Sequence, residues 1–150
     1  MQFHGRDLQK GRVSVPNQIY VVTAVTCERK RVFADSALAK FASRRLHAAS
    51  VDDSIKTLAW VVMPDHIHWM FALKDGPLYR PVQRVKSFIA RDINAVMRVS
   101  GQLWQKGYHD RAMRSEEDVR ALARYIVLNP VRAGLVSRAS DYPYWNAVWL

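Results

Sequence analysis

The chain has 150 residues, 49% of them hydrophobic, which is enough for one ordinary domain with a core of its own. No apolar run reaches the ~18 residues of a membrane span, and the polar start, MQFHGRDLQKGR, lacks the apolar core of a signal peptide. A single cysteine, Cys27, excludes an internal disulfide and an all-cysteine metal site, and it suits a reducing cytoplasm. We therefore expect one cytoplasmic domain over residues 1–150.

The charge is strongly positive and unevenly distributed. A formal net charge of +10 and an isoelectric point near 10.2 are typical of a protein that binds a polyanion, most often nucleic acid. Residues 74–114 contain nine lysines and arginines against three aspartates, so this stretch carries six of the ten net charges. The alternative interpretation is an ordinary basic surface in contact with water.

The first half of the chain predicts a strand, a helix and a hairpin. Residues 19–26, IYVVTAVT, are β-branched and aromatic, as in a strand. Asp35 is suited to cap a helix over 36–49, where apolar residues recur at helical spacing. Two further strands, at 57–63 and 66–73, are joined by a tight proline–aspartate turn.

The second half predicts two helices separated by a short strand. A long helix over 81–99 has an apolar stripe, and arginines recur every seven residues on its other side, at Arg84, Arg91 and Arg98. Lys86 falls inside the apolar stripe, from where long lysines often reach water. After a segment around LWQKGY, Ser115 and Asp118 form a capping-box pattern, and the helix that follows runs until Pro130.

The order of these elements indicates the fold class. Strand, helix, hairpin, helix, short strand and helix together predict an α+β fold of ferredoxin-like kind, with an antiparallel sheet and helices packed on one face. We see no internal repeat, low-complexity tract or linker that would divide the chain.

The stretch MPDHIHWM contains two histidines that are candidate metal ligands. Residues i and i+2 of a strand point to the same face, so His66 and His68 project together. Two adjacent imidazoles can supply two ligands of a divalent metal site, although the pattern H-x-H also arises by chance in strands. The chain is too short for the ~250 residues of an eight-stranded barrel hydrolase. Met70 and Phe71 stand where zinc β-lactamase-like folds need further ligands, and Met70 also stands where histidine-triad nucleotide hydrolases need a third histidine.

The last helix contains two further candidates. Tyr125 and Asn129 are four residues apart, so they lie on one face of a helix. An amide oxygen suits a hard divalent ion, and a tyrosine phenol is a known covalent nucleophile. The same spacing fits a rim tyrosine and a helix-terminal asparagine, so spacing alone leaves both interpretations open. Tyr108, in GYHD, is a rival tyrosine that has no ligand partner at helical spacing.

Five segments carry a resemblance to a known family. They are AWVVMPDHIHWM, LWQKGYHD, EEDVRALARYIVLNPVRAGLV, DYPYWNA and CERKRVFAD, which together extend over nearly the whole chain. They resemble the REP-associated tyrosine transposases, relatives of the single-tyrosine transposases within the HUH endonucleases. The run from Ala123 to Val136 is the most distinctive part of the match.

The resemblance implies a fold, a site and a reaction. The implied fold is ferredoxin-like, and the implied site has His66 and His68 as ligands of Mg²⁺ or Mn²⁺, completed by Asn129. Tyr125 is the implied nucleophile, which cuts single-stranded DNA through a 5′-phosphotyrosine intermediate. Many members have asparagine where Asp65 stands in this chain, a change that leaves the ligands intact.

The resemblance also implies a substrate and a setting. The DNA is expected to be folded into REP (repetitive extragenic palindrome) hairpins, in a bacterial cytoplasm and near the nucleoid. The enzyme is expected to act as a monomer or a homodimer, without a membrane. The expected phosphate contacts are Arg84, Lys86, Arg91, Arg98, Lys106, Arg111 and Arg114. The alternative is a hairpin-binding protein derived from a transposase that no longer cuts DNA.

Overall fold

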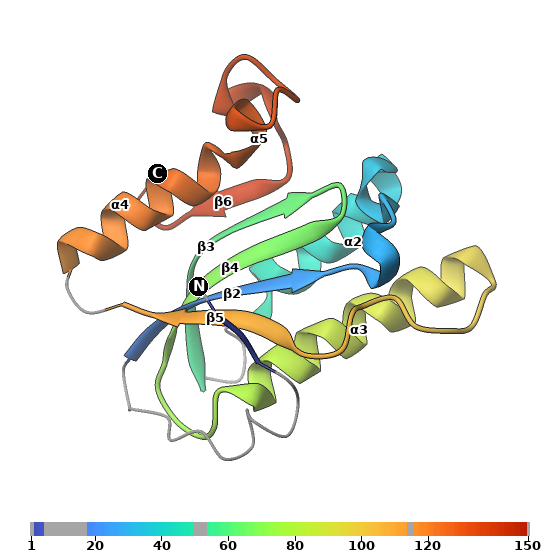
Figure 1. The fold of residues 1–150 in the computed structure, drawn as a ribbon, viewed down its shortest axis with the longest axis horizontal. Helices are drawn as coiled ribbons and strands as arrows, with labels where there is room; N and C mark the ends of the chain where they lie inside the picture. Colours follow the sequence, from blue (N-terminus) through green and yellow to red (C-terminus); the bar gives the residue numbers. More distant parts are fainter. Residues whose placement is uncertain (1, 5–17, 50–53, 114–115, 150) are drawn as a thin grey trace.

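Six strands form one antiparallel sheet in the computed structural model, which describes residues 2–4, 18–49, 54–113 and 116–149. Their order across the sheet is β1-β5-β2-β4-β3-β6 (Figure 1). The strands are β1 (Gln2–His4), β2 (Gln18–Val25), β3 (Ile55–Met63), β4 (His66–Leu73), β5 (Tyr108–Ala112) and β6 (Trp145–Ala147). The α-helices are α2 (Ser36–His47), α3 (Tyr79–Met97), α4 (Glu116–Val127) and α5 (Asn129–Arg132).

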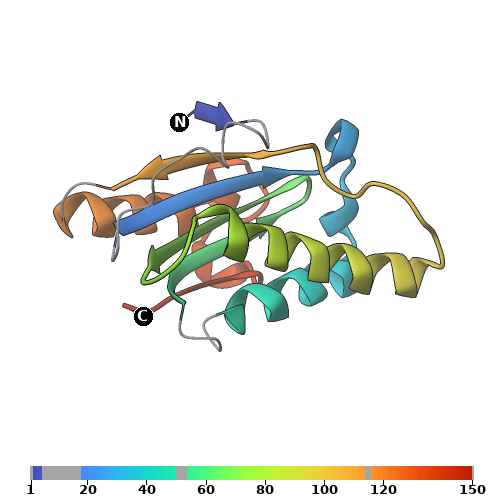
Figure 2. The ribbon, with the colours of Figure 1, turned by 90° about the horizontal axis from the view of Figure 1, so that it is seen from below.

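The central part of the sheet has the ferredoxin-like arrangement. In chain order β2, α2, β3, β4, α3 and β5 form a βαββαβ unit, and its four strands lie in the order β5-β2-β4-β3. Figure 2 shows α2 and α3 next to each other along one side of the sheet. The predicted α+β, ferredoxin-like fold is therefore confirmed, with β1 and β6 added at the two edges.

One part of the fold prediction needs a correction, because the helices do not all share one face. The buried side chains of α4 pack with residues of β3 and β4 that point away from α2 and α3. This second cluster joins Val119 and Ile126 of α4 to Val61 and Met70 of the sheet. The reason is that the βαββαβ unit covers only one face, and the apolar stripe of α4 buries the other.

Strand β4 explains why both faces need a cover. It lies between β2 and β3, and its residues alternate between the two clusters. Ile67, Trp69 and Phe71 are buried on the side of α2 and α3. His66, His68 and Met70 alternate with them and therefore face α4.

The helix ends agree with the sequence in some places and differ in others. Asp35 caps α2 as predicted, because its carboxylate accepts hydrogen bonds from the amides of Ala37 and Leu38 at 2.9 and 3.2 Å. Pro130 lies in the first turn of α5, so the chain stays helical past the end of α4. The predicted capping box at Ser115 lies outside the described residues. Within the described ranges, no helix is long and apolar enough to cross a membrane.

Candidate active site

His66 and His68 lie side by side on the face of the sheet that α4 covers. Their ring centroids are 4.7 Å apart, and the ring planes are inclined by 76°. His68 is paired with Thr23 of β2 on one side and with Val61 of β3 on the other. The two imidazoles therefore share one face, as strand periodicity predicts, in the middle of the sheet.

Each histidine has a hydrogen-bond partner at its Nδ1 atom. The Nδ1 atom of His66 lies 2.7 Å from Oδ1 of Asp65, and that of His68 lies 2.8 Å from Oγ1 of Thr23. Thr23 is only 7% exposed, so its hydroxyl is held in a buried position next to His68. The rings are therefore held in orientation from one side.

The electrostatics of the site favour a neutral imidazole at His68 and an ionised carboxylate at Asp65. Burial lowers the pKa of His68 to about 3, and the nearby charges of His66 and Arg132 add to this shift. Partial burial raises the pKa of Asp65, but the hydrogen bonds and charges of His66 and Arg29 outweigh it, and the net shift is downward. Neutral imidazole is the form that binds a metal ion.

The turn that precedes His66 is fastened by the segment after β2. The amide and the hydroxyl of Thr26 donate to the carbonyl of Asp65 at 2.9 and 3.0 Å, and the amide of Phe33 donates to that of Pro64 at 2.9 Å. Arg29 reaches the Asp65 carboxylate at 3.3 Å from a left-handed backbone conformation, with φ of 52°. These contacts hold Asp65 against the His66 ring.

Tyr125 is exposed on α4, the helix that covers the histidine face of the sheet. Its side chain is 56% exposed, and the guanidinium of Arg132 lies over its ring at 3.5 Å from the centroid. Arg132 also donates a hydrogen bond to the Tyr125 carbonyl. Because the charge of Arg132 lowers the pKa of His68, the corner between α4 and α5 lies close to the pair. Tyr108, by contrast, is 3% exposed on the opposite face.

Asn129 starts α5, one turn after Tyr125, and is half-buried. Helix α5 packs on β3, the strand next to the histidines. Among the described residues, no three His, Cys, Asp or Glu side chains gather into a metal-binding group. A metal centre built on the histidine pair therefore needs a ligand of another kind, and an amide oxygen such as that of Asn129 fits a divalent ion.

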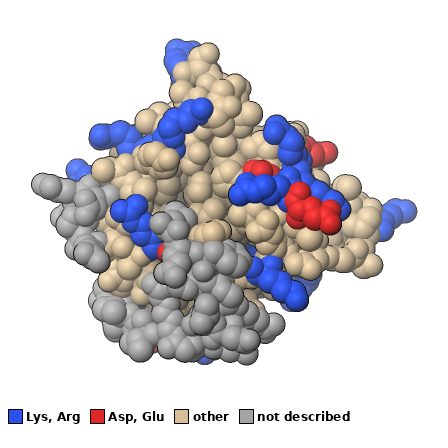
Figure 3. All heavy atoms as spheres, in the orientation of Figure 1, with Lys and Arg blue, Asp and Glu red and all other residues tan. Residues whose placement is uncertain are grey.

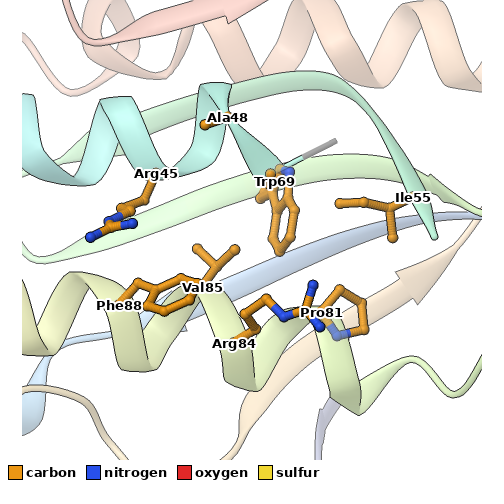
Figure 4. A pocket seen from close by; sticks show the side chains of 9 residues that line it. Arg45, Ala48, Ile55, Trp69, Pro81, Arg84, Val85 and Phe88 are labelled. Carbon is orange, nitrogen blue, oxygen red and sulfur yellow. The ribbon is translucent and has the colours of Figure 1, made fainter. Parts of the chain in front are cut away.

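The predicted phosphate contacts occupy different surroundings. Arg84 lines a cavity of about 250 Å³ between α2 and α3, into which Trp69 points from the sheet (Figure 4). Arg91 lies over the Phe88 ring at 5.5 Å, on the same helix. These two arginines belong to the side of the sheet away from the histidines. Arg111 is exposed and is paired with Val21, which places it on the α4 side.

Lys86 has a structural contact that its sequence position did not reveal. Its ammonium donates to the carbonyls of Gln105 and Gly107 at 3.3 and 2.8 Å and lies 5.9 Å from the Trp104 ring. Burial lowers the pKa of Lys86 to about 8. The lysine therefore ties the segment before β5 to α3.

The remaining predicted contacts are dispersed. Arg98 ends α3 in a left-handed conformation, and exposed Lys106 lies by a cavity of about 540 Å³ beside that helix. Arg114 lies outside the described residues. Figure 3 shows basic side chains at several separate places on one face of the molecule, not in one block.

Three residues at the site were not predicted from the sequence. Strand pairing brings Thr23 to His68, and the loop after β2 brings Arg29 to Asp65. Neither contact follows from a pattern that a single sequence shows. Arg132 had a usable signal, because it follows Tyr125 by seven residues, or two helical turns. A further basic pair, Arg120 and Arg124, lines a cavity of about 400 Å³ beside α4.

Comparison with known proteins gives the class. The model of the IS200-like transposase family matches residues 14–129, and the chain belongs to this family. A REP-associated tyrosine transposase of Escherichia coli K12 is 30% identical over 91 residues, which cover 57% of this chain and 50% of that protein. The match thus spans half of that relative. A Haemophilus influenzae protein assigned to the same group is 25% identical over 156 aligned positions, covering 96% and 84% of the two chains.

Solved structures show the same fold. A REP-associated tyrosine transposase bound to a REP hairpin superposes with a TM-score of 0.75 at 22% identity, over 89% of this chain and 79% of that one. A protein of Deinococcus radiodurans assigned as a transposase gives a TM-score of 0.56 at 23% identity, over 77% and 93%. The resemblance to REP-associated tyrosine transposases, drawn from the motifs, is therefore confirmed.

Proposed function

We propose that this transposase-family protein is an enzyme that cuts and rejoins single-stranded DNA at REP-type hairpins, with Tyr125 as its nucleophile. The observation that carries the proposal is the position of Tyr125: an exposed phenol under the Arg132 guanidinium, on the helix that covers the histidine face of the sheet. The hairpin substrate is supported by the relative of similar fold that is bound to a REP hairpin. The net charge of +10 also suits DNA.

The donor groups fit a divalent ion. His66, His68 and Asn129 would hold Mg²⁺ or Mn²⁺ with two imidazole nitrogens and one amide oxygen, three neutral ligands that leave room for phosphate oxygens. Such an ion polarises the non-bridging oxygens of a phosphodiester when it is bound.

The chain's own residues perform the transfer. The Tyr125 phenol loses its proton and attacks phosphorus, the bond to the 3′-oxygen breaks, and the 3′-hydroxyl leaves with a proton. The 5′ end stays on Tyr125 as a phosphotyrosine ester. Arg132, above the ring, is placed to attract the negatively charged phosphate. One ester replaces another, so a later attack by a 3′-hydroxyl rejoins the strand without ATP.

The proposal extends to how the enzyme works in the cell. One tyrosine makes one cut at a time, so paired cuts need two successive events or two subunits. We propose a monomer or a homodimer that acts on DNA in the cytoplasm.

The test is covalent capture on a denaturing gel. A REP-type hairpin oligonucleotide labelled at its 3′ end keeps its label on the fragment that the tyrosine holds. With Mg²⁺ or Mn²⁺ present, wild type is expected to form a labelled adduct, and Tyr125→Phe none, while DNA binding and thermal unfolding stay unchanged. Tyr108→Phe is the matched control and keeps the adduct. An adduct with Tyr125→Phe would move the nucleophile elsewhere. Hairpin binding without any adduct from wild type would favour the non-cleaving alternative.

A further inference from the structure

Each of the two histidines has its Nδ1 atom within hydrogen-bond distance of a different side chain. Asp65 contacts Nδ1 of His66 at 2.7 Å, and Thr23 contacts Nδ1 of His68 at 2.8 Å. These partners come from separate elements, the hairpin turn and strand β2. That both contact Nδ1 is therefore not a consequence of one local motif. It decides which nitrogen of each ring faces a ligand.

A neutral imidazole carries its proton on one nitrogen and a lone pair on the other. An ionised carboxylate only accepts hydrogen bonds, so the contact with Asp65 requires Nδ1 of His66 to carry the proton. The lone pair is then on Nε2. The hydroxyl of Thr23 can accept from Nδ1 of His68 in the same way, which gives both rings the same tautomer.

We propose that Asp65 and Thr23 are positioning residues, which hold both histidines protonated at Nδ1 so that a divalent ion binds each ring through Nε2. The inference rests on the proposed function, because it concerns the ion that the pair would hold. A hydrogen-bonded partner behind a ligating histidine fixes the ring and makes its free nitrogen a better donor.

Both positioning residues stand on fixed backbone. Thr23 lies in a strand with a neighbour on each side, paired with His68 in β4 and with His109 in β5. Asp65 is tied by its carbonyl to Thr26 and by its carboxylate to Arg29. Groups supported in this way keep a ligand within the narrow range of positions that a metal site needs.

The first experiment reads the tautomers directly, in protein without metal. Two-dimensional ¹H–¹⁵N NMR of the imidazole rings distinguishes protonated Nδ1 from protonated Nε2. Both histidines are expected to carry the proton on Nδ1. Asp65→Asn should weaken this preference at His66 alone, because an amide presents either a donor or an acceptor. Thr23→Val should weaken it at His68 alone, because the methyl group accepts nothing.

The second experiment measures binding of Mn²⁺ by calorimetry. Each variant is expected to bind the ion about 10- to 100-fold more weakly than wild type, the usual effect of losing such a partner. The matched controls, Asp92→Asn and Thr57→Val, remove the same groups from the α2 and α3 side, where Asp92 pairs with Arg45 and Thr57 with Trp69. They should bind Mn²⁺ as wild type does, and thermal unfolding shows whether each variant is folded.

The outcomes separate this inference from the proposed function. A proton on Nε2 of either ring in wild type, or unchanged Mn²⁺ affinity in folded Asp65→Asn and Thr23→Val, overturns the positioning roles while the cleavage proposal stands. Wild type with the expected tautomers but no Mn²⁺ binding overturns the metal dependence itself, and the inference falls with it. The expected tautomers together with weaker binding in both variants support it.

Discussion

The two faces of the sheet differ in what covers them, and strand β4 contributes to both. Towards α2 and α3 it presents Ile67, Trp69 and Phe71, each at most 1% exposed in a core of large apolar side chains. Towards α4 it presents His66 and His68, beside a smaller cluster and an exposed tyrosine. Under the proposed function, neighbouring residues of one strand are thus divided between stability and chemistry. Damage to one face should leave the other function largely intact.

Removal of metal should have the largest effect, and only on the α4 face. Chelation is expected to abolish adduct formation and to leave most hairpin binding, because the phosphate contacts do not depend on the ion. The sheet should remain folded, since the histidines are already hydrogen-bonded to protein groups. Adduct gels, gel shifts and circular dichroism with EDTA, and after return of Mn²⁺, measure this. Unfolding on chelation would show that the ion belongs to the core.

The next largest effect separates two adjacent residues. Trp69→Ala is expected to lower the free energy of unfolding by about 3–5 kcal/mol, because it empties part of the α2 and α3 core. His68→Ala is expected to cost about 1–3 kcal/mol, because it removes the hydrogen bond to the buried Thr23 hydroxyl.

Urea unfolding of both variants measures the difference between their free energies of unfolding. Adduct gels, run under conditions in which both variants are folded, then compare their activity. The Trp69 variant should still form adducts, whereas the His68 variant should form none. The reverse pattern would contradict the division between the faces.

A smaller effect concerns the salt dependence of DNA binding. Each phosphate contact to single-stranded DNA contributes about 0.7 log units of affinity per log unit of salt. Replacing Arg84 and Arg91 of α3 by Glu is expected to flatten the slope by up to about 1.4, if both contact phosphates. Lys40 and Arg44, exposed on α2, provide a control with the same change of charge.

The same measurement on Arg120→Glu with Arg124→Glu sharpens the comparison of the two faces. These residues belong to α4, so a flatter slope from this pair and an unchanged slope from Arg84 and Arg91 would place the DNA on the histidine side only. That result would contradict the predicted role of the α3 arginines.

The smallest effect lies at the rim of the α2 and α3 core. The hydrogen-bonded Arg45 guanidinium lowers the pKa of Asp92, against a smaller opposing effect of burial. A lowered pKa stabilises the fold above the unfolded value of about 3.9 and loses this contribution as pH falls through the folded value. Because both side chains are partly exposed, the pair should contribute less than about 1 kcal/mol.

Urea unfolding of wild type and Asp92→Asn tests this. The stability difference between the two proteins at pH 6 should shrink near pH 3. A difference independent of pH would show that the charge of Asp92 contributes nothing.

What could be predicted from the sequence follows from local periodicity. The alternation of a strand placed His66 and His68 on one face, and Asp35 was recognisable as a helix cap. The order of elements was enough for the ferredoxin-like fold, because that topology follows from a βαββαβ order. The position of α4 on the second face was not readable, since an amphipathic stripe does not say which surface it covers.

The rest depended on pairing between distant segments. Thr23 reaches His68 through the register of β2 on β4, across 45 residues of sequence. Lys86 was expected to contact DNA as a basic residue on a helix, and its bonds to two backbone carbonyls before β5 were not predicted. Arg84 and Arg91 recur with Arg98 as a row in sequence, but Arg84 lies over the cavity between two helices. Periodicity gives the face of an element and not its neighbours.

The hydrogen bonds that hold the Pro64–Asp65 turn make the opening of the site measurable. The amide hydrogens of Thr26 and Phe33 are bound to the two carbonyls of the turn, so they exchange with deuterium only when these bonds open. The same opening releases the Asp65 carboxylate from its place behind His66. The exchange rates of these two amides therefore measure how often the folded protein loses the contact between Asp65 and His66.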